Sequence, residues 1–315
     1  MSENSGYFVP VGELSRQGRF VRGTVKTVVR PAFAAADYPW VQRGLLKLMN
    51  GISRLPKGTI IRKENILGLP CEWIASSEAA MDDPRTILYL HGGGFVCGGA
   101  DSHREFAAHI AKGAGLRVLL PEYRLAPENP FPCANDDCLG MYRWLLRHGV
   151  SADQIVVGGD SAGGCLALMT LISARDAGDP MPAAGLLFSP ATDCLEFDGE
   201  SYVTRKDADP WFSPVVIRKL VAHYAVANHP RISILAPLRR PLNDLPPLYI
   251  QVGDAEVLQS DSVRFAERAK EAGTQVTLEV WEHMWHDFPM FAGLMPESRE
   301  ALARVTAFVK ERLGA

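Results

Sequence analysis

From about Thr59 to the C-terminus, short apolar runs alternate with longer stretches in which apolar residues recur every three or four positions. Continuous apolar runs are typical of buried parallel strands, and the longer stretches are typical of amphipathic helices. The alternation predicts an α/β fold, with a mostly parallel central sheet flanked by helices. The predicted strands are Thr86–Leu90, Arg117–Leu120, Gln154–Val157, Ala184–Phe188, Leu248–Val252 and Val276–Trp281. The predicted helices are Ser102–Gly113, Ala134–His148, Ala162–Ala177, Ser260–Ala272 and Glu297–Leu313.

Two segments depart from this alternation. In residues 1–58, apolar positions at helical spacing predict two amphipathic helices, with Pro31 and Gly51 as breakers. Residues 191–247 are rich in proline, contain no predicted strand, and include a helical piece near Val215–Ala227. We interpret residues 1–58 as N-terminal cap helices and 59–315 as the main domain, with a cap insertion at about 191–247. Such a cap would cover the carboxyl edge of the sheet, where α/β proteins bind ligands.

Composition excludes several function classes. Lys and Arg number 33 against 36 Asp and Glu, and a net charge of −3 offers no field that would attract nucleic acid. The first residues lack a basic and apolar leader, and no run approaches the ~18 apolar residues of a membrane span, so we expect a cytoplasmic protein. The six cysteines show neither C-x-x-C nor zinc spacing, and we interpret them as mostly buried thiols, with no metal site.

The segment Gly159-Asp-Ser161-Ala-Gly163 directly follows a predicted strand and directly precedes a predicted helix. This context is typical of a nucleophile elbow, in which a serine occupies a strained turn and small neighbours let the chains pass. The amino end of the following helix also favours an anionic intermediate. We therefore interpret Ser161 as a candidate nucleophile.

His91-Gly-Gly-Gly-Phe95 follows the strand that ends at Leu90. Successive glycines at a strand end allow backbone N–H groups to face a bound oxygen, as in an oxyanion hole. The run lacks the phosphate-binding pattern G-x-x-x-x-G-K-[ST], which disfavours a nucleotide site. His91 is interpreted as structural, and His103 and His109 as surface or capping residues.

A serine nucleophile needs a histidine base, and the histidine needs a carboxylate that fixes its tautomer. The run Gly253-Asp254-Ala-Glu256 follows one predicted strand, and Glu282-His283-Met-Trp-His286 follows the next. The order of serine, acid and histidine is that of α/β-hydrolases. From the residues alone, Glu256 and Asp261 remain alternatives to Asp254 as the acid, and His283 remains an alternative to His286 as the base.

The combination of HGGGF, Tyr123-Arg-Leu-Ala-Pro-Glu128, GDSAGG and a final M-x-H-x-F resembles the hormone-sensitive-lipase-like esterases of the α/β-hydrolase superfamily. The resemblance covers the chain from about Ile87 onward. It implies a catalytic triad and an oxyanion hole formed by backbone N–H groups, with the triad consisting of Ser161, Asp254 and His286 and the hole of Gly93, Gly94 and Ala162. Two departures are Gly253-Asp-Ala-Glu-Val-Leu258 in place of a D-P-L motif, and His283 in place of a glycine.

These observations predict a serine carboxylesterase that hydrolyses short-to-medium acyl esters without a metal, nucleotide or other cofactor. A hydrolase of monoterpene-type lactones is the alternative with the same triad. A peptidase and a non-catalytic ligand-binding module are alternatives of other classes, and the presence of His286 disfavours the binding module. Trp211, Phe212 and Trp40 are candidates for the pocket wall. The resemblance also implies a homodimer through an exposed edge strand near Val276–Val280.

Overall fold

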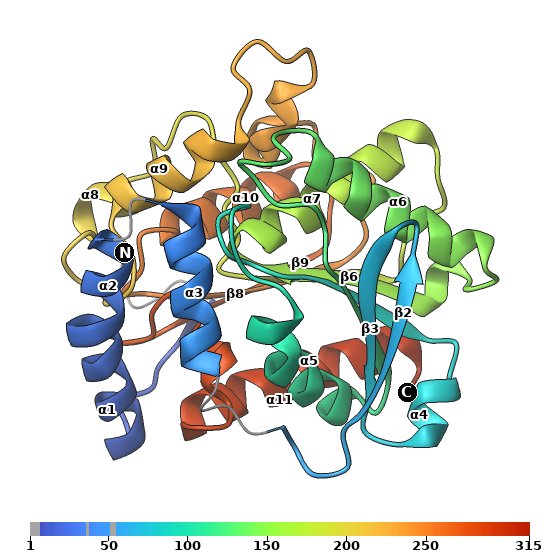
Figure 1. The fold of residues 1–315 in the computed structure, drawn as a ribbon, viewed down its shortest axis with the longest axis horizontal. Coiled ribbons are helices and arrows are strands. Elements are labelled where there is room, and N and C mark those ends of the chain that lie inside the picture. The colour runs from blue at the N-terminus through green and yellow to red at the C-terminus, as the bar shows by residue number, and fades with distance from the viewer. Residues whose placement is uncertain (1–6, 36–37, 51–54) are drawn as a thin grey trace.

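The computed structural model describes residues 7–35, 38–50 and 55–315, and in this part of the chain one nine-stranded sheet forms the centre of the molecule. The strand order is β1-β9-β8-β7-β6-β4-β5-β3-β2, with β3 antiparallel to β5, β2 antiparallel to β3 and all other pairs parallel. Helices cover the sheet (Figure 1). The α/β-hydrolase fold class is thereby confirmed. The strands are β1 (Phe8–Val9), β2 (Ile60–Ile66), β3 (Leu69–Ala75), β4 (Thr86–Leu90), β5 (Arg117–Pro121), β6 (Ile155–Asp160), β7 (Ala184–Phe188), β8 (Leu248–Gly253) and β9 (Val276–Trp281).

The helices that connect the parallel strands lie within two residues of their predicted bounds. Helices α5 and α7 each end at a glycine in the left-handed conformation, which is the usual C-terminal stop signal. Helix α7 is buried along nearly its whole length because it packs directly behind β6. These helices are α5 (Ala100–Ala114), α6 (Cys133–Arg147), α7 (Ser161–Ala177), α10 (Gln259–Glu271) and α11 (Pro296–Leu313), and the shorter elements are α4 (Glu78–Asp82) and 3-10 turns at Ala152–Gln154 and Phe288–Phe291.

Three strands were not predicted. Strands β2 and β3 form a hairpin at one edge of the sheet, where four consecutive residues of β2 are exposed and leave no apolar run. Strand β1 is only two residues long, and it pairs with Val280 and Trp281 of β9 at the opposite edge. The prediction of β9 as an exposed edge strand is therefore wrong at its carboxyl end, where the chain's own N-terminal segment covers it.

The N-terminal helical segment is more continuous than predicted. Helix α1 (Arg16–Thr24), a π-helical turn (Val25–Val29) and α2 (Arg30–Ala35) follow one another directly, and α3 (Pro39–Asn50) comes next. Pro31 does not break this run. A proline ring clashes with the carbonyl four residues earlier in an α-helix, and the wider π turn before it relieves that clash. Gly51, the other predicted breaker, lies outside the described residues.

The insertion between β7 and β8 contains no strand; it consists of α8 (Ser201–Thr204), α9 (Pro214–Tyr224) and 3-10 turns at Ile232–Leu235 and Pro237–Arg239. It lies beside the N-terminal helices (Figure 1). The two segments are joined by Arg30, whose guanidinium donates to the backbone carbonyls of Lys206 and Asp209 at 3.0 and 2.8 Å. Among the described residues, no helix is both long and apolar enough to cross a membrane.

Candidate active site

The turn between β6 and α7 places Ser161 at the wall of a cavity. Ser161 has a φ of +52°, a conformation that costs free energy for any residue with a side chain and is typical of functional turns. The small residues around it are required by sterics. A Cβ on Gly159 would lie 2.5 Å from the carbonyl carbon of Gly163 and from the Leu90 carbonyl oxygen. The motif therefore folds as the sharp turn that its sequence predicts.

The glycine loop after β4 lies against the same cavity. Gly93 has a φ of +116°, and a Cβ there would lie 2.1 Å from the carbonyl oxygen of Cys97. Among the described residues, the N–H groups of Gly93 and Gly94 donate no hydrogen bond within the chain. Both glycines and Ala162 line the cavity, so these N–H groups are available to a bound oxygen.

His91 supports the glycine loop from behind. Its imidazole is fully buried and stacks on the ring of Tyr123 with the ring centres 4.1 Å apart. The Tyr123 hydroxyl donates to the His91 carbonyl at 2.7 Å. Burial lowers the pKa of His91 to about 3, so the imidazole is neutral at physiological pH. These contacts agree with the structural role that the sequence indicates.

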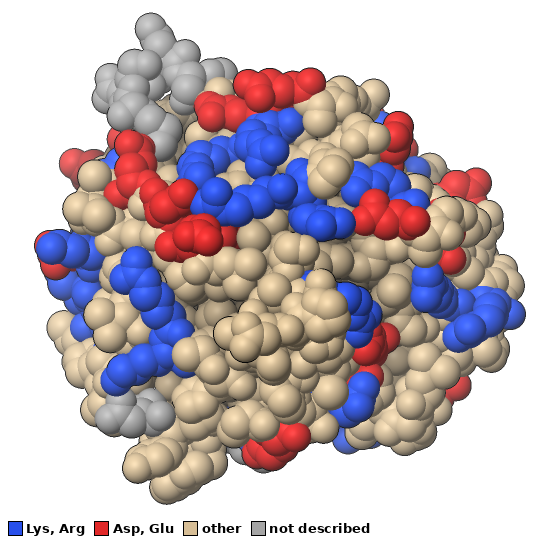
Figure 2. Space-filling view, turned by 90° about the horizontal axis from the view of Figure 1, so that it is seen from above, with Lys and Arg blue, Asp and Glu red and all other residues tan. Residues whose placement is uncertain are grey.

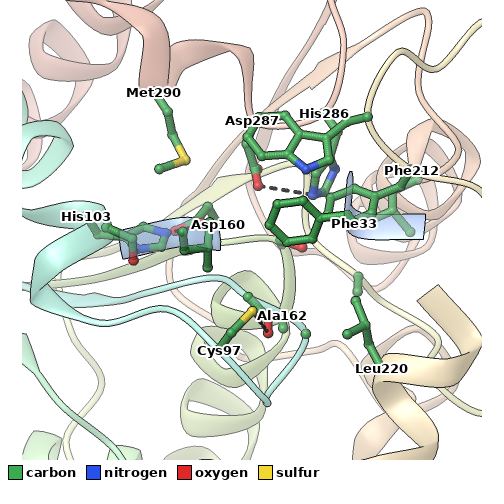
Figure 3. A pocket seen from close by; sticks show the side chains of 18 of the residues that line it. Phe33, Cys97, His103, Asp160, Ala162, Phe212, Leu220, His286, Asp287 and Met290 are labelled. Carbon is green, nitrogen blue, oxygen red and sulfur yellow. Dashed lines mark hydrogen bonds and ion pairs between the residues drawn. The ribbon is translucent and has the colours of Figure 1, made fainter. Parts of the chain in front are cut away.

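His286 lies on the loop after β9 and faces two carboxylates. Its Nδ1 is 3.6 Å from Oε1 of Glu256, and its Nε2 is 3.0 Å from Oδ2 of Asp287 (Figure 3). Nδ1 and Oε1 are both buried and have no other partner. Among the described residues, no hydrogen bond joins His286 to Ser161, although both line the cavity. Apo active sites often show such loose geometry, which tightens when substrate binds.

The structure brings Glu256 to the histidine, whereas the sequence analysis favoured Asp254. That preference is not supported. The charged groups that act on Asp254 are His283, Arg205 and Arg22. Asp261, the third alternative, is also occupied elsewhere, because it accepts hydrogen bonds from the backbone N–H groups of Thr192 and Asp193.

Local contacts explain why Glu256 reaches the histidine. The loop after β8 curls back, so that Oε2 of Glu256 accepts hydrogen bonds from the N–H of Gly253 at 3.1 Å and from the Ser189 hydroxyl at 2.9 Å. These bonds aim Oε1 at His286. A signal in the sequence could have identified it, because aligning the family's D-P-L motif on Leu258 places Glu256, and not Asp254, at the aspartate position.

The two carboxylates control the protonation of His286. Burial alone would lower the pKa of this imidazole, but the charges of Asp287 and Glu256 outweigh burial and hold the pKa well above its ordinary value. The pKa of Asp287 is itself raised, first by burial and further by repulsion from Asp160 and Glu256, against the attraction of His286. The histidine therefore loses its proton only at a comparatively high pH.

Two other histidines differ in their surroundings. His283 is half exposed and lies 3.7 Å from Glu282, so the structure does not place it beside the carboxylates that face His286. His103 was interpreted as a surface or capping residue, and that prediction is wrong. It is buried and forms a 3.2 Å ion pair with Asp160, the residue before the elbow serine. Figure 3 shows this pair at the cavity wall, away from Phe212 and Leu220.

The cavity has a volume of about 520 Å³ and is mostly apolar. Trp211 and Phe212, two of the candidates for the pocket wall, line it, and the Phe212 ring contacts His286 edge-on with the ring centres 5.1 Å apart. Trp40 does not line it. Its side chain is 70% exposed and stacks on Tyr38. The remaining apolar walls come from both cap segments and the main domain: Phe33, Leu46, Ile217, Leu220, Val221, Leu258, Met290 and Phe291.

The outer surface near the cap carries charges of both signs. Figure 2 shows Lys and Arg side chains mixed with Asp and Glu around a broad uncharged area. A mixed surface gives no long-range field of one sign. This face therefore presents no uniform field that would steer a charged ligand.

Comparisons with known proteins agree with this geometry. A family model described as the α/β-hydrolase fold matches residues 87–290. An acetyl-hydrolase from Streptomyces hygroscopicus is 39% identical over 243 residues, which cover 77% of this chain and 80% of that protein. An esterase from Acinetobacter venetianus is 33% identical over 252 residues, covering 79% of this chain and 81% of that protein.

Solved structures point to a narrower group. The crystal structure of an esterase from the bacterial hormone-sensitive lipase family matches with a TM-score of 0.89 and 38% identity, covering 96% of this chain and 100% of that one. An esterase/lipase from an uncultured bacterium matches with a TM-score of 0.88 and 34% identity over the same shares. Because it shares its fold and more than a third of its sequence with such enzymes over most of its length, the chain belongs to the hormone-sensitive-lipase-like family of α/β-hydrolases and is a carboxylic ester hydrolase.

Proposed function

We propose that this enzyme hydrolyses short-to-medium acyl esters through an acyl-enzyme, with Ser161 as nucleophile, His286 as base and Glu256 as the acid that orients the histidine. The observation that carries the proposal is the strained conformation of Ser161 at the wall of a cavity that His286 also lines. The position of Glu256 at Nδ1 of His286 supports the choice of acid.

The reaction follows from these positions. Ser161 Oγ attacks the ester carbonyl carbon while Nε2 of His286 takes its proton, and Glu256 stabilises the resulting imidazolium through Nδ1–H. The oxyanion receives hydrogen bonds from the N–H groups of Gly93, Gly94 and Ala162. His286 then protonates the leaving alcohol, and a water molecule deprotonated by the same nitrogen releases the acid from Ser161. Nε2 gives up its contact with Asp287 when Ser161 reacts.

The apolar cavity supports the proposed range of acyl chains. Each buried methylene contributes up to ~0.8 kcal/mol, so kcat/KM should rise with chain length until the cavity is full and then fall. Part of the wall comes from two cap segments that hydrogen bonds tie to each other, which favours a closed pocket over a wide lipase lid. We therefore expect an optimum at about C4 to C8.

One experiment tests the chemistry and the substrate range. Wild-type enzyme and Ser161→Ala are assayed with p-nitrophenyl esters from acetate to palmitate, alongside lactones and peptide amides. The variant should keep the wild-type melting temperature and lose about 10⁴- to 10⁶-fold in kcat, because the other catalytic groups cannot act without the nucleophile. Substantial activity in a folded variant would remove Ser161 from its role, and an optimum at C12 or longer would refute the pocket argument.

A further inference from the structure

Asp209 lies in the insertion between α8 and α9 and is fully buried. Its Oδ1 accepts hydrogen bonds from the backbone N–H groups of Trp211 and Phe212, at 2.7 and 3.0 Å. Its Oδ2 accepts a hydrogen bond from the backbone N–H of Val257 at 3.0 Å. One carboxylate thus joins the cap to the loop that carries the neighbouring residue Glu256.

The two segments that Asp209 joins, the turn at Phe212 and the loop at Glu256, both contact His286. Phe212 packs its ring edge-on against the imidazole, and Glu256 faces Nδ1. A second contact strengthens the loop side, because the Ser201 hydroxyl donates to the Val257 carbonyl at 2.6 Å. On the cap side, Arg30 of the N-terminal helices donates to the Asp209 carbonyl at 2.8 Å. The loop after β8 that carries Glu256 and Val257 is called the acid loop below. Both cap segments and the acid loop therefore meet at Asp209.

We propose that Asp209 is a positioning residue, which couples the closed cap to the orientation of the Glu256 carboxylate and thereby to the basicity of His286. The proposal rests on the proposed function, in which Glu256 is the acid. A hydrogen bond to a charged acceptor is about twice as strong as a neutral one, so the Val257 N–H is held firmly. Since Val257 adjoins Glu256, this bond limits how far Oε1 of Glu256 can move from Nδ1 of His286.

Asp193 provides a matched comparison within the same insertion. It is also buried, and its Oδ1 accepts the N–H groups of Leu195 and Glu196 at 3.2 and 3.1 Å, as Asp209 does with Trp211 and Phe212. Its second oxygen binds Arg239 at 2.6 Å and not the acid loop. In Asp193→Asn the remaining side-chain oxygen can still accept the turn N–H groups, so this variant loses the contact of the second oxygen with Arg239 and leaves the link to Val257 intact.

The test compares Asp209→Asn, Asp209→Ser and Asp193→Asn by melting temperature and by the pH profile of kcat and kcat/KM with p-nitrophenyl butyrate. A serine can still accept from the turn N–H groups, but it is too short to reach Val257. Both Asp209 variants should lower kcat by about 10- to 100-fold, as expected for displaced catalytic groups, and Asp193→Asn should change kcat less than about 3-fold. If Asp209→Asn fails to fold, Asp209→Ser carries the test.

A double-mutant cycle with Glu256→Gln separates positioning from a direct charge effect. Glu256 and Asp287 are the two carboxylates that face His286, but the charge of His286 also acts on Asp209, so removing Asp209 would itself lower the pKa of the histidine. If Asp209 acts through Glu256, then adding Asp209→Asn to the Glu256→Gln variant should lower kcat by less than about 2-fold.

Equal losses in both backgrounds, or wild-type kcat in Asp209→Ser, would overturn the link. If Glu256→Gln alone retained full activity, the proposed acid would fail instead, and the cycle would show this before Asp209 is considered.

Discussion

The elbow after β6 and the acid loop after β8 hold the proposed nucleophile and the proposed acid at the same edge of one sheet, yet different contacts determine their shapes. The elbow is shaped largely within its own motif, because Gly159 and Gly163 approach each other across the strained Ser161. The acid loop is held by groups far away in the sequence: the Ser189 hydroxyl binds Glu256, and the Asp209 carboxylate binds Val257.

This difference explains why the sharp turn of the elbow could be recognised in the sequence, whereas the contact of Glu256 with His286 could not. A five-residue motif that carries its own steric requirement can be recognised without the rest of the fold. Which of two carboxylates faces a histidine depends on the distant hydrogen bonds that turn the loop. The spacing from Leu258 is the one signal in the sequence that favours Glu256, and the contact of Glu256 with His286 depends on the hydrogen bonds from Ser189 and from the backbone of Gly253.

The strongest test of the comparison changes the two carboxylates of the acid loop one at a time. Glu256→Gln should lower kcat by about 10²- to 10⁴-fold, because an amide cannot stabilise the imidazolium or hold its tautomer. Asp254→Asn is the matched control and should cost less than about 3-fold. Steady-state kinetics with p-nitrophenyl butyrate provide the measurement, and the reverse ranking would restore Asp254 as the acid.

The second test adds one methyl group to the elbow. Gly159→Ala would place a Cβ 2.5 Å from backbone atoms of Gly163 and Leu90, so the strand end and the helix must separate. Displacing reacting groups by about 1 Å lowers the reaction rate on the order of 100-fold. We therefore expect kcat/KM to fall by at least that factor and the melting temperature to be lower.

Gly23→Ala is the control for this test. A Cβ at Gly23 would meet nothing within 4 Å, so this variant should match the wild type in both measurements. A fully active Gly159→Ala enzyme would show that the elbow is not determined by its own sterics.

The smallest expected effect concerns the pH profile. His286 must be neutral to act as a base, so activity should rise with pH through a histidine pKa that lies above its ordinary value. Asp287→Asn removes one of the two carboxylates that raise this pKa, and the acidic limb of kcat/KM should move by about one unit to lower pH. Glu282→Gln removes a carboxylate that lies beside His283 and should leave the limb in place. An unchanged limb in Asp287→Asn would contradict the assigned cause.

Long apolar runs and amphipathic helices allowed most of the main domain to be predicted. Helix α10 was predicted as Ser260–Ala272 and is observed at Gln259–Glu271. The predictions failed where a local pattern was weak or where a distant partner decides the environment. Strand β2 is polar because it lies at an edge. His103 lies on an ordinary helical pattern, and its main charged partner, Asp160, comes from the end of β6, far away in the sequence.

The aromatic candidates for the pocket wall illustrate the same limit. Trp211 and Trp40 are equivalent by composition and by their place in predicted cap segments. The Asp209 turn directs the segment that begins at Trp211 into the cavity, whereas Trp40 lies on the outer side of α3. Burial of a single aromatic residue in a cap is set by packing between segments, which no local pattern records.

The short strand β1 connects the N-terminal helical segment to the strand that precedes the loop of His286, the proposed base. The backbone N–H groups of Val280 and Glu282 donate to the carbonyls of Tyr7 and Val9, and the Glu282 carboxylate accepts from Val11 and Gly12. Glu282 is followed directly by the loop that carries His286. The N-terminal segment therefore also anchors the loop of the proposed base. We expect that a chimera with a foreign N-terminal segment would change the position of His286, and with it the turnover of even the smallest ester.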